Sequence, residues 1–176
     1  MLKTKNINSK LNEYQQILEL YRSAFPENEK LPIWLLNLMS KRKCVDFLAF
    51  YDEDVFCGFT YLIHHHQTTF VLYLAINRNV RSKGYGSKIL KWISDHAQKN
   101  IILNIETVWT KYENYNQRLS RQKFYFKNGF SDTQYKMIDN GEKYDVLYKG
   151  EHFSTLECEA LLKHFSFGFY RKKLSR

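Results

Sequence analysis

The spacing of apolar residues alternates along the chain between the periods of a helix and of a strand. Helical spacing predicts helices over residues 12–24, 88–97, 116–128 and 155–164. A short helix with Pro32 in its first turn is also expected. Its apolar side chains are Trp34, Leu35, Leu38 and Met39.

Between these helices lie short apolar runs with the period of a strand. Residues 45–51 and 55–63 flank an acidic turn and predict a hairpin. Residues 70–76 are apolar throughout, so this strand is expected to be buried on both faces. Further strands are expected at 101–109, 130–138 and 144–149, the last two joined by the tight turn Asp139-Asn140-Gly141. The pattern predicts an α/β protein whose sheet is largely antiparallel.

Composition agrees with one domain that has a sizeable core. The chain has 176 residues, of which 44% are hydrophobic and 16% aromatic, too many for a disordered protein. No apolar run is long enough to span a bilayer, and the first residues lack the apolar core of a signal peptide. We therefore expect a cytoplasmic protein without a membrane partner. The widely spaced Cys44, Cys57 and Cys158 are expected to be buried thiols.

The formal net charge of +9 favours an anionic partner. Phosphate-bearing small molecules and nucleic acids both fit this charge. The sequence contains no helix-turn-helix or zinc pattern, and its aromatic residues fit a core, which disfavours nucleic acid. The basic clusters Lys41–Lys43 and Arg171–Lys173 are expected to be solvated.

A glycine-containing loop offers the best candidate for anion binding. The sequence Arg81-Ser82-Lys83-Gly84-Tyr85-Gly86-Ser87 joins the buried strand to the helix expected from Lys88. Glycines allow a tight turn, and the first N–H groups of a helix have no partner within it. Phosphates bind at such helix ends. Two glycines instead of three, and no Gly-Lys-Ser/Thr, disfavour dinucleotide and P-loop sites. The alternative is an ordinary strand-to-helix turn.

A second motif follows at the end of the helix over 116–128. The segment Arg121–Phe130 carries Phe124-Tyr125 and ends in Asn128-Gly129, a helix stop, before the next strand begins. Together, Arg-x-x-Gly-x-Gly and Phe-Tyr followed by Asn-Gly-Phe resemble the GNAT superfamily of acetyl-CoA-dependent N-acetyltransferases. The resemblance covers about residues 11–150.

This resemblance implies a fold and a function. It implies an α+β fold with a central mixed, mostly antiparallel sheet of six or seven strands, opened between the strands at 70–76 and 101–109 to admit acetyl-CoA. Residues 1–176 would form one domain, with a helical extension over 151–176. The implied reaction transfers an acetyl group to a primary amine of a small molecule or peptide within a ternary complex. The alternatives are a non-catalytic acyl-CoA-binding module and a basic nucleic-acid-binding protein.

The resemblance also assigns residues to the cosubstrate. Backbone N–H groups of the loop would hold the pyrophosphate, and N–H groups of the preceding strand would polarise the thioester carbonyl. Arg118 and Arg121 stand where family members carry Asn and Ala, so Asn114 or Asn116 could replace the Asn contact. The residues expected to bind acetyl-CoA are Leu74, Ala75, Ile76, Arg81, Ser82, Lys83, Gly84, Tyr85, Gly86, Ser87, Asn116 and Arg121.

Two residues are candidates for proton transfer. Tyr125 matches the family tyrosine that faces the sulfur and would protonate the departing thiolate; the alternative is a packing aromatic. Arg121, four residues earlier, lies on the same helix face. The strand before the loop carries no carboxylate, which departs from many family members. Glu106 is the remaining candidate for the general base. The alternative role for Glu106 is that of a structural glutamate with satisfied partners. A base is not needed if water relays the proton or the amine binds in its neutral form.

Three further features have weaker implications. His64-His65-His66 is a poor metal site, because alternate residues of a strand face opposite sides, and a strand end or pocket rim is expected. Glu27 and Glu29 could attract a cationic amine or be solvated. Apolar residues near the C-terminus could pack on the core or form a homodimer contact: Phe165, Phe167 and Phe169.

Overall fold

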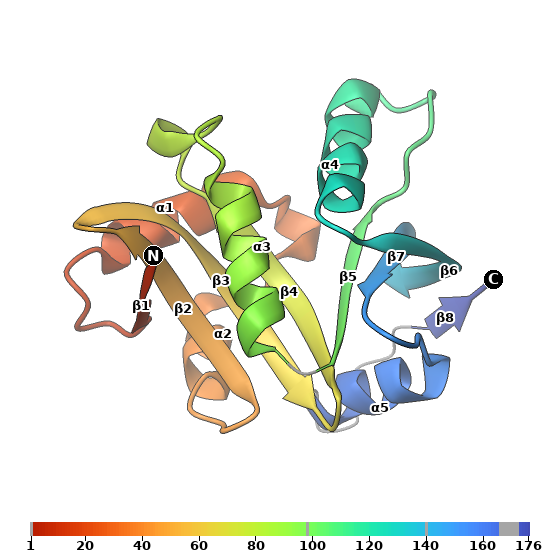
Figure 1. Cartoon of the computed structure of the whole chain (residues 1–176), viewed down its shortest axis with the longest axis horizontal. Coiled ribbons are helices and arrows are strands. Elements are labelled where there is room, and N and C mark those ends of the chain that lie inside the picture. Colours follow the sequence, from red (N-terminus) through yellow and green to blue (C-terminus); the bar gives the residue numbers. More distant parts are fainter. Residues whose placement is uncertain (1, 98, 140, 166–172) are drawn as a thin grey trace. The chain divides into compact units, whose positions relative to one another are not determined.

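The computed structural model describes the chain except residues 1, 98, 140 and 166–172. The described strands form an eight-stranded sheet in the order β1-β2-β3-β4-β5-β7-β6-β8 (Figure 1). Within it the chain forms two compact units. Unit 1 comprises Met1–Ile63 and Leu72–His96, and unit 2 comprises His64–Val71 and Ala97–Arg176.

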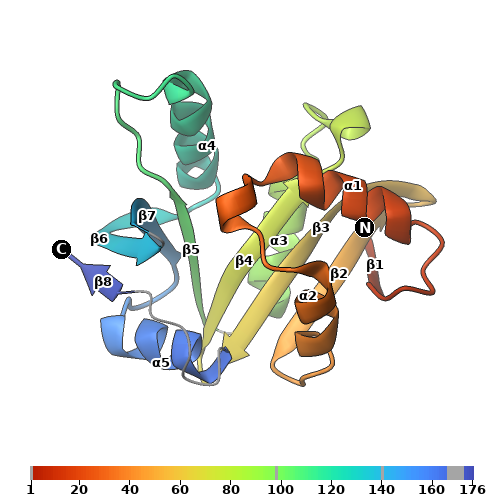
Figure 2. The same ribbon diagram turned by 180° about the vertical axis from the view of Figure 1, so that it is seen from behind.

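Unit 1 is a three-layer arrangement. Helix α3 covers one face of its strands, and α1 and α2 cover the other (Figures 1 and 2). Its elements are β1 (Lys3–Asn6), α1 (Tyr14–Ala24), η1 (Glu27–Glu29), α2 (Ile33–Met39), β2 (Val45–Asp52), β3 (Val55–His65), β4 (Thr68–Ile76), η2 (Arg78–Val80) and α3 (Tyr85–His96), where the last residues of β3 and the first of β4 belong to unit 2.

The predicted hairpin is confirmed. β2 and β3 pair antiparallel from Val45↔Ile63 to Asp52↔Val55. β1 pairs antiparallel with β2, although its sequence, Lys-Thr-Lys-Asn, has no apolar face. The prediction for α2 is partly wrong. Of the predicted side chains, Met39 is buried, but Trp34 and Leu38 are exposed. Leu36 is buried in their place, because apolar residues on most sides of this seven-residue helix leave its inward face undetermined by the pattern.

Gly58 of β3 allows a close approach between two strands of unit 1. A Cβ atom at this position would lie 2.3 Å from the carbonyl oxygen of Ala75 in β4, closer than any side chain tolerates. The backbone of β4 at Ala75 is therefore covered directly by the backbone of β3. This contact holds the strand that leads into the candidate anion-binding loop.

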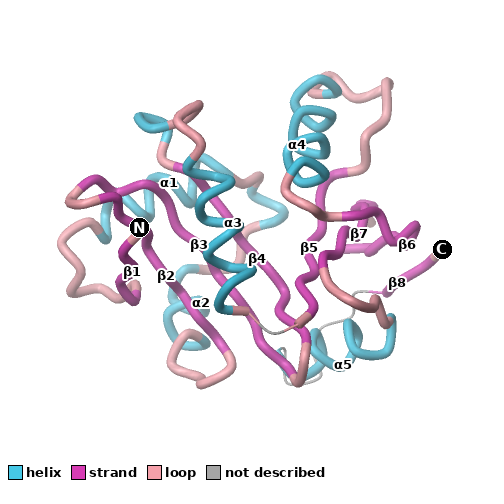
Figure 3. Tube along the Cα trace, viewed as in Figure 1, coloured by secondary structure: helices cyan, strands magenta, loops and turns pink. Residues whose placement is uncertain are grey.

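Over the described residues, unit 2 contains the remaining strands and the helices α4 and α5, which Figure 3 distinguishes by colour. Its first strand segment, from β4, pairs parallel with β5 from Thr68↔Asn100 to Phe70↔Ile102. β5 pairs antiparallel with β7, and β6 pairs antiparallel with both β7 and β8. The elements are β5 (Asn100–Glu106), α4 (Tyr115–Lys127), β6 (Ser131–Asp139), β7 (Glu142–Lys149), α5 (Thr155–Phe165) and β8 (Lys173–Ser175).

The predicted α+β class with a mixed, mostly antiparallel sheet is confirmed. The sheet has eight strands instead of six or seven, because the short edge strands β1 and β8 carry no periodic signal. β8 also adds a strand to the C-terminal segment that was expected to be helical. The opening between β4 and β5, and the organisation as a single domain, stay predictions.

Most predicted helix and strand ends are confirmed within a few residues. Gly129 after α4 has a φ of +85°, the left-handed conformation expected of a helix stop. Ser154 Oγ accepts a hydrogen bond from the Glu157 N–H at 3.3 Å and begins α5. Cys57 and Cys158 are buried thiols, as predicted, and Cys44 is half-buried. Asn140 of the predicted tight turn lies outside the described residues.

Candidate functional site

In unit 1, Asn77 determines where the chain leaves β4. Its backbone N–H donates to Cys57 O at 2.9 Å, and its side-chain Nδ2 donates to Phe56 O at 2.8 Å. Its Oδ1 accepts from the Asn79 N–H at 3.2 Å and begins η2. Sequence reasoning missed Asn77. The available signal was an Asn directly after a strand, where its side chain can bond to the backbone two residues on.

The predicted anion-binding loop follows η2. Arg81, Ser82, Lys83 and Gly84 are exposed, and Gly84 has a φ of +79°. A side-chain atom added at Gly84 would meet nothing within 4 Å. The loop is thus open to solvent on this side and carries two cationic side chains.

Helix α3 begins at Tyr85, three residues before the predicted Lys88. Its first hydrogen bond runs from the Lys88 N–H to Gly84 O at 3.1 Å. The N–H groups of Tyr85, Gly86 and Ser87 therefore precede the first N–H that donates within the helix, that of Lys88, and lie at the positive end of the helix dipole. The glycine motif itself supplies the first helical turn, which strengthens the case for anion binding at backbone atoms.

Tyr85 ties this first turn to the end of β2. Its hydroxyl donates to Asp52 Oδ2 at 2.8 Å, and Lys88 Nζ lies 3.8 Å from the same carboxylate oxygen. The hydrogen bond to Asp52 raises the pKa of Tyr85 to about 12. The Tyr85 side chain therefore serves as a neutral anchor while its backbone N–H stays at the helix end. No pattern in the sequence pointed to Asp52 as the partner of Tyr85.

The strand before the loop alternates in burial. Ala75 is buried, whereas Leu74 and Ile76 are half-buried. Tyr73 occupies the region where a carboxylate was missing, and its hydroxyl donates to Glu29 O at 2.8 Å and accepts from the Leu31 N–H at 3.0 Å. This position is thus used to hold the segment before α2.

In unit 2, Glu106 at the end of β5 binds several donors. Its Oε2 accepts from Arg121 Nη1, and its Oε1 accepts from Asn114 Nδ2 at 3.3 Å and lies 3.4 Å from Arg118 Nη2. Only 13% of the Glu106 side chain is exposed. This environment is that of a structural glutamate with satisfied partners, and a role as base stays a prediction. Asn116, predicted to bind the cosubstrate, is exposed.

Arg118, which lies near Glu106, also contacts other groups of unit 2. Its Nε donates to Asn114 Oδ1 at 2.7 Å, and its Nη1 donates to Thr107 O at 3.1 Å. Its guanidinium carbon lies 3.8 Å from the centroid of the Tyr112 ring. We define the Glu106 cluster as Glu106, Asn114, Arg118 and Arg121. The structure brings together the predicted site residues Glu106 and Arg121, which the sequence did not link to each other.

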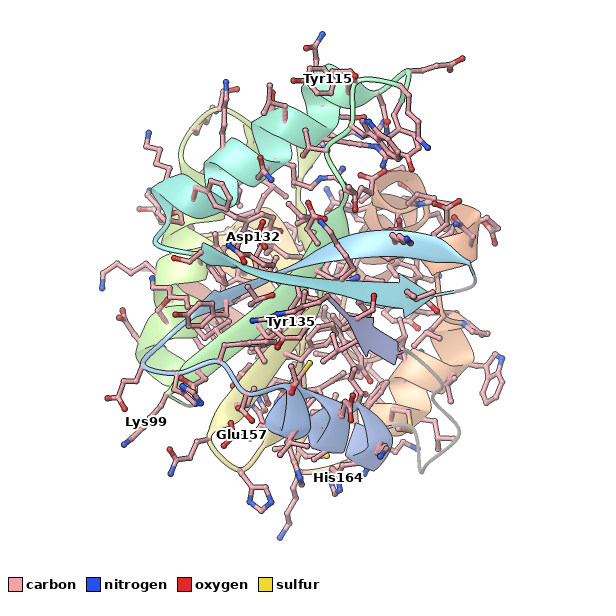
Figure 4. All side chains as sticks on the ribbon, turned by 90° about the vertical axis from the view of Figure 1, so that its right-hand side faces the viewer. Lys99, Tyr115, Asp132, Tyr135, Glu157 and His164 are labelled. Atoms are coloured by element: carbon pink, nitrogen blue, oxygen red, sulfur yellow. The ribbon has the colours of Figure 1, made fainter. Side chains whose placement is uncertain are left out.

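Tyr125 lies farther along α4 and is half-buried. Its ring centroid is 5.2 Å from that of Phe124 and 5.6 Å from that of Phe130. Among the described residues its hydroxyl makes no hydrogen bond that would hold its proton. Burial raises the pKa of Tyr125 to about 12, and the Arg121 cation acts in the opposite direction. The phenol is therefore protonated at neutral pH. Figure 4 labels Tyr115, where α4 begins, and Asp132 of β6, the strand that follows α4.

The three consecutive histidines lie at the end of β3 and in the turn after it. His64 Nδ1 is 2.9 Å from Thr69 Oγ1. The ring of His65 stacks on that of His164, with centroids 4.7 Å apart, and contacts His66 at 4.1 Å. His164 lies at the C-terminal end of α5 (Figure 4). Over the described residues, no group of three potential metal ligands was found.

Comparison with known proteins shows the family. The model of the acetyltransferase (GNAT) domain matches residues 44–132, just over half of the chain. The chain therefore belongs to the GNAT acetyltransferase family. No curated protein sequence matches it significantly. In the part of the chain that the structure describes, no helix is both long and apolar enough to cross a membrane.

Several solved structures share the fold. A protein of Bacteroides thetaiotaomicron assigned to the GNAT family is 20% identical, with a TM-score of 0.77 and coverage of 96% of this chain and 99% of that chain. The PaiA N-acetyltransferase of Thermoplasma acidophilum, in complex with coenzyme A, is 16% identical, with a TM-score of 0.58 and coverage of 86% and 99%. YncA of Salmonella typhimurium, with acetyl-CoA, is 14% identical, with a TM-score of 0.60 and coverage of 88% and 97%.

Proposed function

We propose that this protein transfers an acetyl group from acetyl-CoA to a primary amine of a small molecule or peptide, directly, within a ternary complex. The observation that carries the proposal is the open loop at Gly84 followed by the first-turn N–H groups of α3, which precede the first hydrogen bond within that helix. Membership of the GNAT family supports it, as do the coenzyme A and acetyl-CoA present in two structures of the same fold.

Each binding task falls to a named group. The N–H groups of Tyr85, Gly86 and Ser87 donate to the pyrophosphate, and Arg81 and Lys83 add positive charge beside it. Acetyl-CoA supplies an activated thioester. A backbone N–H within Leu74–Ile76 donates to the thioester oxygen as negative charge develops there, which needs no particular side chain.

Proton transfer falls to Tyr125 and water. The amine nitrogen bonds to the carbonyl carbon, the carbon–sulfur bond breaks, and Tyr125 gives its proton to the departing thiolate. Its raised pKa keeps the phenol protonated at neutral pH, and the Arg121 cation, which acts on the pKa in the opposite direction, favours release of that proton. The excess proton on the amine goes to water, because both oxygens of Glu106 already accept from Arg and Asn donors. Water returns a proton to the Tyr125 phenolate, which restores the acid for the next turnover.

The proposal names the acceptor only as a primary amine of a small molecule or peptide. Glu27, expected either to attract a cationic amine or to be solvated, is exposed and pairs with Lys30 at 2.6 Å, which neutralises part of its charge. Glu29 is half-buried, and its carbonyl accepts from Tyr73. The segment that carries both glutamates is nevertheless anchored, so it can present a defined surface to an acceptor.

The proposal is tested by measuring release of the coenzyme A thiol from acetyl-CoA with a panel of polyamines, aminoglycosides and peptides. At least one amine should support turnover, and Tyr125→Phe should lower kcat by about 100-fold while the affinity for acetyl-CoA is retained. Tyr135→Phe, a matched change elsewhere in unit 2, should leave kcat unchanged. Acetyl-CoA binding without turnover on the whole panel would favour the non-catalytic acyl-CoA-binding module.

A further inference from the structure

Helix α4 carries the proposed acid but buries none of its side chains fully. Most surface helices are held in one rotation about their axis by a buried apolar stripe. In α4 the apolar side chains Leu119, Phe124 and Tyr125 are only half-buried, so polar contacts can contribute more to its rotation than in a fully packed helix. Arg118, Arg121 and Tyr125 are spaced by three and four residues and therefore share one helix face. Glu106 contacts this face.

Glu106 is well placed to hold the helix. It is the last residue of β5 and pairs with Tyr144 of β7, so its backbone belongs to the sheet. Its carboxylate contacts Arg121, one turn before Tyr125, and Arg118, two turns before it. Arg118 is only 14% exposed and is itself held by Asn114 and Thr107. The cluster thus ties β5 to the first two turns of α4 through two cations.

The other end of α4 has a separate anchor. Lys149 Nζ of β7 donates to Asn128 O, just after the helix, at 3.1 Å. Phe130, in the chain that follows, lies against the Tyr125 ring. Tyr125 is therefore located between two attachments to the strands of unit 2, and only the one at Glu106 acts on its own helix face.

We propose that Glu106 is a positioning residue for acetyl transfer, which holds α4 through Arg121 and Arg118 in the rotation that presents the Tyr125 hydroxyl. This inference rests on the proposed function, in which Tyr125 is the proton donor. In this role Glu106 anchors α4 and does not act as a general base. It also explains why arginines stand at the two positions where family members carry Asn and Ala, because both arginines are partners of this one carboxylate.

A first experiment reports on Tyr125 without any turnover. Fluorotyrosine is placed at position 125 of the full chain, and its fluorine NMR resonance is compared among variants. Glu106→Gln should shift or broaden the resonance, and Arg121→Met should do the same. Arg121→Lys, which keeps the cation, should restore it toward the wild type. The matched control Glu113→Gln, an exposed glutamate before α4, should leave it unchanged.

A second experiment separates an anchor from a base. With acetyl-CoA and the fastest amine of the panel, Glu106→Gln should lower kcat by about tenfold, leave KM for acetyl-CoA within about twofold, and keep the shape of the pH–rate profile. Loss of the acidic limb of that profile in Glu106→Gln would show a base and overturn the proposal.

Other outcomes are equally decisive. An unchanged fluorine resonance in both Glu106→Gln and Arg121→Met would overturn the positioning role, and the arginine variant keeps the test valid if Glu106→Gln fails to fold. If the wild type turns over no amine, the proposed function fails separately, while the resonance still decides whether Glu106 orients Tyr125.

Discussion

The loop of unit 1 and helix α4 of unit 2 carry different parts of the proposed chemistry and are held by different forces. The loop leads into α3, which buries Ile89, Leu90 and Ile93 almost completely. α4 buries no side chain fully and is held by the Glu106 cluster. Packing suits the loop, because the atoms proposed to bind the cosubstrate belong to the backbone. In the proposed mechanism Tyr125 acts through its side chain, whose direction depends on the rotation of the helix.

The packing that holds the loop of unit 1 is most easily disrupted at Gly58 of β3. In Gly58→Ala the new methyl group would overlap Ala75 O at 2.3 Å, so β3 and β4 must separate. We expect the free energy of unfolding to fall by about 3 kcal/mol, measured by urea denaturation. Gly141→Ala is the control, since its site is open and only its φ of +83° is unfavourable. Its cost should be about 1 kcal/mol.

An equal cost for both alanine variants would contradict this account. It would mean that β3 and β4 adjust to the methyl group without loss, and that packing at Ala75 does not hold the strand before the loop.

The ionic character of unit 2 can be tested away from the proposed site. Asp145 is buried in β7 and accepts from Lys136 and from Thr107 Oγ1 at 2.8 Å. Lys136→Met leaves its carboxylate without a cation and should lower the free energy of unfolding by about 2 kcal/mol. The exposed pair Lys91–Asp95 of α3 provides the control, and Lys91→Met should cost less than about 0.5 kcal/mol. A cost for Lys136→Met as small as that for the exposed pair would contradict a stabilising role of the Lys136–Asp145 pair in unit 2.

A smaller effect is expected from the stacked histidines of unit 2. Burial, followed by the neighbouring His66 and His164, lowers the pKa of His65 below its usual 6.5. The unfolded chain therefore binds this proton more readily, so stability is complete above the usual pKa and declines as pH falls through it toward the folded pKa.

Unfolding between about pH 8 and about pH 5 should show this loss, amounting to less than about 1 kcal/mol. His65→Gln should remove that component, and His152→Gln should not. A pH dependence that persists unchanged in His65→Gln would show that other groups cause it.

The smallest effect is expected from removing the hydrogen bond between Tyr85 and Asp52, which anchors the first turn of α3 in unit 1. Asp52→Asn removes the carboxylate that raises the pKa of Tyr85 to about 12. The pKa should move toward the usual value of about 10, observed as a tyrosinate absorbance that is absent from the Asp52→Asn/Tyr85→Phe double variant. Asp54→Asn, an exposed neighbour, is the control. An unchanged Tyr85 pKa in Asp52→Asn would exclude the anchor.

The sequence predicted the features that depend on local backbone chemistry. The strand, glycine loop and helix around Gly84 and the helix stop at Gly129 were recognised because glycine spacing reports on backbone conformation. The partners of side chains were not predicted. Helical spacing placed Arg121 and Tyr125 on one face, but only the fold brings Glu106 to that face. Asp52 and Gly58 were missed for the same reason, since their partners are distant in the sequence.

The most direct test of the account is a calorimetric titration of acetyl-CoA into the wild type, Gly84→Glu and Gly84→Ala. We expect saturable binding by the wild type, and loss of binding in Gly84→Glu, whose carboxylate would stand beside the N–H groups that we propose to bind phosphate. Gly84→Ala, which shares the unfavourable φ without the charge, should retain binding within about tenfold. Equal binding by the wild type and Gly84→Glu, or no binding by the wild type, would contradict the assignment of this loop to acetyl-CoA.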